Sequence, residues 1–342
     1  MNHKAGLITA YSVAHFIVDF ACAFLMFRMM IGSQNLHISL LIYNFAAFAL
    51  QMPIGLLADR WNRNGVCAAI GCGLIALAFL FGDYAILSVL IAGVGNGFFH
   101  VGGGIDVLNV SKDKPLLLGI FVSPGAIGIY LGTMLGKQLT LSDFVVVSVL
   151  IFMMLLLLFL QYIEKRNFRS VNALLSFEGL ASPKVLIAIG SLLLVVILRS
   201  YIGMTSTFGW KSSAFWAMLY VGAIVFGKIG GGILAVFVGL KKTCILSLSL
   251  AAVFFLFSDH PVLGIAAVFF FNMTMPLTLW AVAKLLAGSK GFSFGLLTFG
   301  LFLGFLPTYL ELKPLFSTTI GFAIAALLSL GLLLFGLRRV VT

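Results

Sequence analysis

Twelve apolar segments, separated by short polar breaks, make up most of this 342-residue chain. A helix needs about 20 apolar residues to cross the hydrocarbon core of a membrane, and most of these segments reach that length. We predict helices over residues 5–30, 38–58, 65–81, 84–109, 115–136, 142–163, 185–203, 212–238, 243–257, 261–286, 291–308 and 315–337. The ninth helix has the shortest apolar run, because a polar break begins at Ser258.

The composition agrees with a lipid environment. Hydrophobic residues make up 62% of the chain and charged residues only 9%, whereas soluble domains carry about 25% charged residues. So few charges could not cover a water-facing surface, and the short breaks leave no room for a soluble domain. The sequence therefore predicts an all-α, multi-pass membrane protein.

Basic residues occur in every second break. These breaks and the C-terminus hold Arg60 and Arg63; Lys112 and Lys114; Lys165, Arg166, Arg169 and Lys184; Lys241 and Lys242; Lys290; and Arg338 and Arg339. The only Lys or Arg residues in the opposite breaks are Lys137, Lys211 and Lys313. Because cytoplasmic loops are enriched in Lys and Arg, we predict an even number of spans, with both termini cytoplasmic, in a bacterial-type inner membrane.

Several classes of protein are disfavoured by the sequence. The net charge of +11 lies at the ends of apolar segments instead of in a basic stripe, so it favours contact with anionic lipid headgroups over nucleic acid. The cysteines lie inside apolar runs, which argues against a disulfide framework or a zinc site. We find no phosphate-binding loop and no catalytic constellation. The sequence thus predicts a non-enzyme with no catalytic residue, cofactor or metal.

The longest polar stretch divides the predicted helices into six and six. We predict an N-terminal half at 1–163, a cytoplasmic linker at 164–184 and a C-terminal half at 185–342. Repeated halves of this kind are related by an axis along the membrane normal in many transporters.

The break after the second helix reads Gly55-Leu-Leu-Ala-Asp59-Arg60-Trp-Asn-Arg63. It resembles the signature loop of the major facilitator superfamily, at the position between spans two and three that the family requires. The resemblance implies a twelve-helix fold of two six-helix halves. Gly55, Asp59, Arg60 and Arg63 would form a conformational latch at the cytoplasmic face, since ion pairs there can form in one state and break in another. Alternatively, these residues only end a helix and fix its topology.

Three further motifs are similar to the fosmidomycin-resistance-type efflux branch of that superfamily. They are His15-Phe-x-x-Asp19, Gly97-Phe-Phe-His100 and Ser123-Pro-Gly-Ala-x-Gly128. This resemblance implies proton-driven efflux. The present chain is shorter and its loops are sparser, so the substrate cannot be carried over.

Polar residues at mid-membrane depth are costly, by at least ~2.5–3.5 kcal/mol for an ionised group, and need a reason. His15 and Asp19 are four residues apart and share one helix face, as do Asn96 and His100. The family resemblance places both helices at a central cavity. We predict that Asp19, with His15 and His100, couples transport to protons; alternatively, these residues pair and hold helices together. Asn96 either joins helices or contacts substrate.

The second half contains cations but no acid within its helices. We predict that Lys228 and Arg199, with Asn272, bind an anionic group of the substrate. Alternatives are that Arg199 reaches outward to the membrane surface and that Lys228 pairs with Asp19. Pro124 and Pro276 are expected to kink their helices.

The sequence therefore predicts a monomeric transporter that moves a small organic anion by alternating access, with protons and membrane lipid as its other partners. Proton-coupled efflux by antiport is the first hypothesis. A symporter or facilitator for uptake is the alternative in the same architecture. A non-transporting scaffold is disfavoured by Asp19, Lys228 and the loop at Asp59.

Overall fold

The computed structural model describes residues 3–30, 36–111, 114–164, 182–312 and 315–340, and among these the regular structure is entirely helical. The first half forms α1 (His3–Met30), α2 (Leu36–Asn44), the π-helical η1 (Phe45–Ala49), α3 (Gln51–Trp61), α4 (Asn64–Ala78), the 3₁₀ segment η2 (Phe79–Phe81), α5 (Ala85–Ser111), α6 (Leu116–Val122), α7 (Pro124–Gln138) and α8 (Asp143–Glu164). The second half forms α10 (Pro183–Thr205), η3 (Gly209–Ser212), α11 (Ala214–Val238), α12 (Leu240–Phe255), α13 (Pro261–Asn272), α14 (Thr274–Leu285), α15 (Lys290–Tyr309) and α16 (Thr319–Leu337).

These elements form the twelve predicted spans. Within the described residues, eleven helical segments are long and apolar enough to cross a membrane. The twelfth, α12, has 16 residues, or about 24 Å of helix at 1.5 Å per residue. It corresponds to the ninth predicted helix, whose apolar run is the shortest. Most of the predicted linker, residues 165–181, lies outside the described residues.

Two spans are broken near a proline. The fifth breaks at Ser123, between α6 and α7, where Pro124 cannot donate a backbone hydrogen bond. The tenth breaks at Met273, within the turn that precedes Pro276, where the proline ring crowds the Asn272 carbonyl and supplies no N–H to it. Both predicted proline kinks therefore coincide with helix breaks. The break places Pro276 in the first turn of α14, where a missing N–H costs little because that group has no partner within the helix.

The chain divides into two compact units. Unit 1 contains residues 1–110, 124–175 and 288–299, and unit 2 contains residues 111–123, 176–287 and 300–342. Unit 2 therefore includes α6 from the first half of the chain, and unit 1 includes the start of α15 from the second. The predicted halves at 1–163 and 185–342 and the linker at 164–184 describe an order along the sequence and not these packing units. That division stays a prediction.

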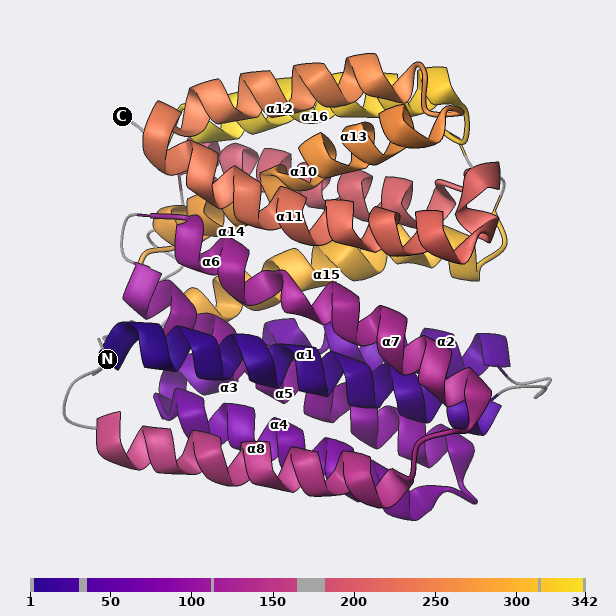
Figure 1. The fold of residues 1–342 in the computed structure, drawn as a ribbon. Coiled ribbons are helices and arrows are strands. Elements are labelled where there is room, and N and C mark those ends of the chain that lie inside the picture. Colours follow the sequence, from indigo (N-terminus) through magenta and orange to yellow (C-terminus); the bar gives the residue numbers. More distant parts are fainter. Residues whose placement is uncertain (1–2, 31–35, 112–113, 165–181, 313–314, 341–342) are drawn as a thin grey trace. The chain divides into compact units, whose positions relative to one another are not determined.

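Unit 1 is held together by close helix packing through glycine. The helices α1 and α7 lie side by side (Figure 1). A Cβ atom at any of three glycines of α7, spaced four residues apart, would collide with a backbone carbonyl of α1. The glycines are Gly128, Gly132 and Gly136, and they face the carbonyls of Phe16, Phe20 and Phe24. Small residues at this spacing let two helices approach closely.

Unit 2 joins α6 to the helices of the second half. Its largest helix contacts are those of α12 with α16, of α11 with α13 and of α10 with α16 (Figure 1). The helix α6 packs on α11, where a Cβ atom at Gly119 would lie 2.6 Å from the carbonyl oxygen of Lys228. A Cβ atom at Gly232 would lie 2.8 Å from the Cα atom of Leu116. Two glycines, one on each helix, thus bring α6 and α11 into backbone contact.

Candidate functional site

A buried polar cluster surrounds Asp19 on α1. The residue is 9% exposed, and its Oδ2 atom lies 3.1 Å from Nε2 of His15. Its Oδ1 atom accepts a hydrogen bond from Asn96 Nδ2 at 3.0 Å and lies 3.7 Å from His100 Nε2. The structure therefore brings together all four polar residues that the sequence singled out on the first and fourth spans.

The two histidines of this cluster face each other. Their Nε2 atoms are 2.9 Å apart, and their rings meet edge to face with centroids 4.5 Å apart. His100 Nδ1 lies 2.9 Å from the backbone carbonyl of Asn96. Because a carbonyl oxygen can only accept, Nδ1 of His100 must carry a proton. A neutral His100 then presents a lone pair on Nε2 to His15.

Gly125 closes the cluster from the side of α7. A Cβ atom there would collide with Asp19 Oδ2 and with His15 Nε2. The glycine thus permits the first turn of α7 to lie directly against the cluster. Gly125 belongs to the motif Ser123-Pro-Gly-Ala-x-Gly128, and no role at this site was predicted for it.

A second, partly buried carboxylate lies on α5 and contacts α1, and no role was predicted for it. Asp106 on α5 accepts hydrogen bonds from the Tyr11 hydroxyl and from Asn64 Nδ2, both at 2.7 Å. Tyr11 is four residues before His15, so Tyr11, His15 and Asp19 form one polar stripe along α1. Tyr11 extends this stripe toward Asp106, so the spacing on α1 could have indicated a polar partner for Tyr11 on a neighbouring helix.

Asp59 binds the beginning of α15. Gly291 N–H donates to its Oδ1 atom at 2.8 Å, and Phe292 N–H donates to Oδ2 at 2.9 Å. These are first-turn N–H groups, which have no partner within their own helix. Lys290 Nζ also donates to Asn109 Oδ1. All these contacts lie within unit 1.

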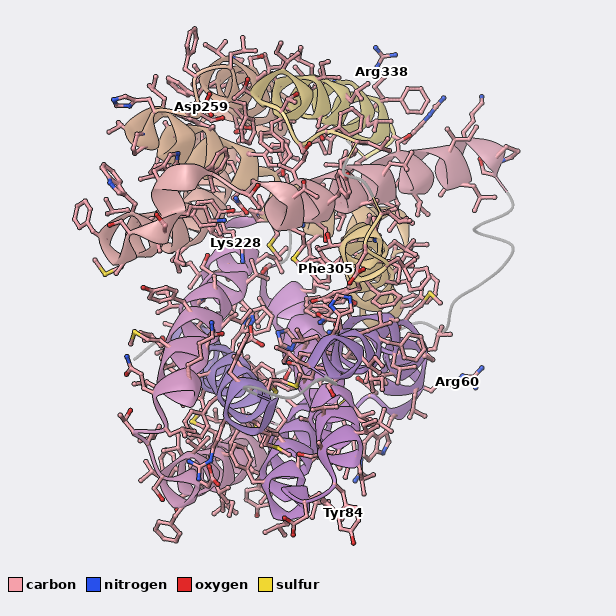
Figure 2. All side chains as sticks on the ribbon, turned by 90° about the vertical axis from the view of Figure 1, so that its right-hand side faces the viewer. Arg60, Tyr84, Lys228, Asp259, Phe305 and Arg338 are labelled. Atoms are coloured by element: carbon pink, nitrogen blue, oxygen red, sulfur yellow. The ribbon has the colours of Figure 1, made fainter. Side chains whose placement is uncertain are left out.

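Gly55 makes this contact possible, whereas the arginines of the motif do not take part in it. A Cβ atom at Gly55 would collide with the carbonyl group of Gly291. Arg60 and Arg63 are exposed, and the Arg60 side chain points away from the helices (Figure 2). Of the four predicted latch residues, Gly55 and Asp59 therefore lie in the contact.

Lys228 reaches from α11 to the end of α6 (Figure 2). Its Nζ atom donates to the Val122 carbonyl at 2.9 Å. Next to it, the Ser123 hydroxyl lies 2.5 Å from the Gly119 carbonyl oxygen and 3.1 Å from the Val225 carbonyl oxygen. Lys228 thus ties the broken fifth span to α11, and its predicted role toward substrate stays a prediction.

Arg199 on α10 is the most deeply buried of the predicted substrate-binding cations. Its side chain is buried, at 8% exposed, and Nη1 has no hydrogen-bond partner among the described residues. It does not reach outward to a surface. Asn272 donates from Nδ2 to the Val268 carbonyl of its own helix at 2.9 Å.

Lys211 lies in η3, outside the membrane-spanning segments. Burial lowers the pKa of its ammonium group, because a charged group loses hydration there. The ammonium donates to the Ser206 carbonyl at 3.1 Å and lies 4.1 Å from the Tyr220 ring centroid. These contacts make Lys211 a structural residue of unit 2.

Solved structures of transporters superpose on nearly the whole chain. The fucose:proton symporter of E. coli does so with a TM-score of 0.70 at 12% identity, over 98% of this chain and 99% of that chain. A structure of a major facilitator superfamily transporter in the outward conformation gives 0.64 at 14% identity, over 96% and 99%. The chain has the major facilitator fold.

A third similar structure belongs to a bacterial homologue of the iron transporter ferroportin in an outward-facing state. Its TM-score is 0.66 at 15% identity, over 98% of both chains. No protein-family model and no curated protein matches the sequence. The predicted fold class, an all-α membrane protein of twelve helices with the major facilitator fold, is confirmed. The resemblance to the fosmidomycin-resistance-type branch stays a prediction.

Proposed function

We propose that this protein is a secondary transporter of the major facilitator superfamily that moves a small organic anion by alternating access, coupled to protons. The observation that carries the proposal is the buried carboxylate of Asp19, held by three side chains from α1 and α5 in a major facilitator fold. A buried ionisable group in a membrane protein is costly and is usually kept for function.

The chemistry of this cluster supports proton coupling. The Asp19 carboxylate and the His15 imidazole are in direct contact at 3.1 Å, so a proton can pass between them without a large movement. His100 extends the contact to α5. A proton bound here neutralises Asp19 and weakens its attraction to the imidazoles, which changes the balance between conformations.

Arg199 is the cation best placed to recognise an anion. Its buried guanidinium retains a donor with no partner in the described part of the chain, and a carboxylate or phosphate would supply the missing charge and acceptors. Lys228 already donates to a backbone carbonyl, so it is the second candidate for substrate binding after Arg199. Asn96 and Asn272 would contribute amide groups.

The contact of Asp59 and Gly55 with α15 serves as the conformational latch in this proposal. Formation of the contact holds α3 against the start of α15, and its loss releases them. The basic breaks orient the protein with both termini in the cytoplasm of a bacterial-type cell and with the latch at that face. The transporter would act as a monomer.

Efflux by antiport is the proposed direction, and uptake by symport or facilitated diffusion is the alternative. An antiporter requires that protonation of the Asp19 cluster and occupancy by substrate exclude each other. A symporter requires that each favours the other. A reconstituted system distinguishes these cases because the direction of proton movement during substrate flux has opposite signs.

The test is transport in proteoliposomes with an imposed pH gradient, a panel of small organic anions and a pH-sensitive dye inside. The wild-type protein should move at least one anion with accompanying proton flux. Asp19→Asn should abolish accumulation driven by the pH gradient and leave exchange of substrate in place. Asp259→Asn, at an exposed acid, is the control and should behave like the wild type. Accumulation that survives Asp19→Asn would place the coupling site elsewhere.

A further inference from the structure

The Asp19 cluster contains the ligand atoms of a metal site. One ligand atom each from His15, Asp19 and His100 lie within 4.8 Å of one another, and all three residues are buried. We propose that these three side chains bind a divalent first-row transition-metal ion. The proposal goes beyond transport, since binding is a property of unit 1 and can be measured without substrate flux.

Two of the three spacings among the ligand atoms fit one face of an octahedron. The third is wider, since the Asp19 oxygen nearest to His100 Nε2 lies 3.7 Å away, so the Asp19 carboxylate and the His100 ring must move closer together around an ion. Ligand atoms bonded at about 2.1 Å and at right angles lie about 3.0 Å apart. The Nε2 atoms of His15 and His100 are 2.9 Å apart, and His15 Nε2 is 3.1 Å from Asp19 Oδ2. Two imidazoles and one carboxylate, once the third spacing closes, would form a facial triad that suits ions such as Fe²⁺, Mn²⁺ or Co²⁺ and leaves positions for water or substrate.

Asn96 orients two of the three ligands. Its backbone carbonyl accepts from His100 Nδ1, which leaves the Nε2 lone pair of a neutral His100 directed at the cluster. Its side-chain Nδ2 donates to Asp19 Oδ1, which leaves Oδ2 for the ion. Metal-binding histidines and carboxylates are commonly held by such outer hydrogen bonds, which fix the tautomer and the orientation of each ligand.

The ligand set also determines which ions should bind. Imidazole nitrogen favours transition metals, whereas Mg²⁺ prefers oxygen ligands and retains its water. The ligands must be deprotonated to bind a cation. Protons and a metal ion would therefore compete for the same three side chains.

Direct binding to the full-length protein tests the proposal. Metal-free protein in detergent is titrated with Co²⁺, whose visible absorption reports imidazole coordination, and the bound ion is counted after dialysis. We expect one Co²⁺ per chain, no displacement by an excess of about 100-fold Mg²⁺, and a melting temperature raised by Co²⁺ but not by Mg²⁺. Absence of Co²⁺ binding, or displacement by Mg²⁺, would overturn the proposal.

Variants separate this site from adventitious binding. His100→Gln removes a ligand and should weaken Co²⁺ binding by more than the 10–100-fold loss typical of outer-shell changes, which we expect for Asn96→Leu. Gly125→Ala keeps all three ligands but displaces two, so it should also weaken binding. His260→Gln, at an exposed histidine, is the matched control and should have no effect.

Equal affinity in His100→Gln and the wild type contradicts the proposal, as does a loss caused by His260→Gln. Melting curves without metal identify any variant that has failed to fold, and the wild-type Mg²⁺ comparison then still decides.

Discussion

Asp59 and Gly291 are 232 residues apart in the sequence, and the N–H group of Gly291 donates to Asp59 Oδ1 at 2.8 Å. With the Phe292 N–H on the other oxygen, the carboxylate caps the first turn of α15 from a different helix. A negative charge is favourable at this end of a helix, where the backbone dipoles leave a partial positive charge.

Replacement of Asp59 by Asn should weaken this cap. Asn retains one oxygen of similar shape but loses the charge, so at least one N–H group loses a charge-assisted partner. We expect a cost of about 1–2 kcal/mol, enough to change the equilibrium of the contact about tenfold. The melting temperature should fall, and the transport rate in proteoliposomes should change.

Asp83→Asn, at an exposed acid in a loop, is the matched control for Asp59→Asn. It should leave the melting temperature and transport rate unchanged. If Asp59→Asn behaves in the same way, the motif around it determines topology alone.

Gly55→Ala should separate α3 from α15, because the added methyl group meets the Gly291 carbonyl. Overpacking of this kind costs about 1–3 kcal/mol. Gly222→Ala in α11 is the control, since a Cβ atom there meets nothing within 4 Å. That control should be neutral or stabilise the protein by about 0.5–1 kcal/mol, as expected for Ala over Gly in a helix. Thermal unfolding measures the stability of both variants. An equal change of melting temperature in Gly55→Ala and Gly222→Ala would show that α3 shifts to make room for the methyl group.

Lys228→Met should loosen α6 from α11. The substitution preserves length but leaves the Val122 carbonyl without the ammonium donor, at a cost of about 1–3 kcal/mol. Ser123→Ala removes a donor at the same junction without a change of charge. Both variants should lower the melting temperature. A rise in KM for an anionic substrate in Lys228→Met alone would assign the lysine to substrate binding, and equal KM values would restrict it to the junction.

Arg199→Gln should weaken anion binding without destabilising the protein. Removal of a buried cation that lacks a full set of partners relieves a desolvation penalty, so the melting temperature should stay the same or rise. Affinity for the anion should fall about tenfold or more, since a charged hydrogen bond contributes about 1.5–3 kcal/mol. Lys284→Gln, at an exposed cation, should change neither. A destabilised Arg199→Gln with normal affinity would make the arginine structural.

The helices could be predicted because apolar length decides which segments enter a membrane. The pairs His15–Asp19 and Asn96–His100 could be predicted as well, since spacing by four fixes a shared face within one helix. Periodicity carries no information about which helices meet. It therefore could not show that the two pairs come together, or that Asp59 reaches α15.

Contacts made through the backbone were the hardest to foresee. The Val122 carbonyl attracts Lys228 only because α6 ends there, and the break at Met273 depends on where Pro276 falls within α14. Gly125 belongs to the site through the absence of a side chain, which no search for chemical groups detects.

The exchange of segments has a consequence for any attempt to divide this protein. Unit 2 needs α6 from the first half of the chain, and unit 1 needs the start of α15 from the second. A cut between α8 and α10 would leave unit 1 without the start of α15 and would separate α6 from α11, on which it packs. Fragments produced together in the same cell should therefore complement one another, whereas either fragment produced alone should be degraded.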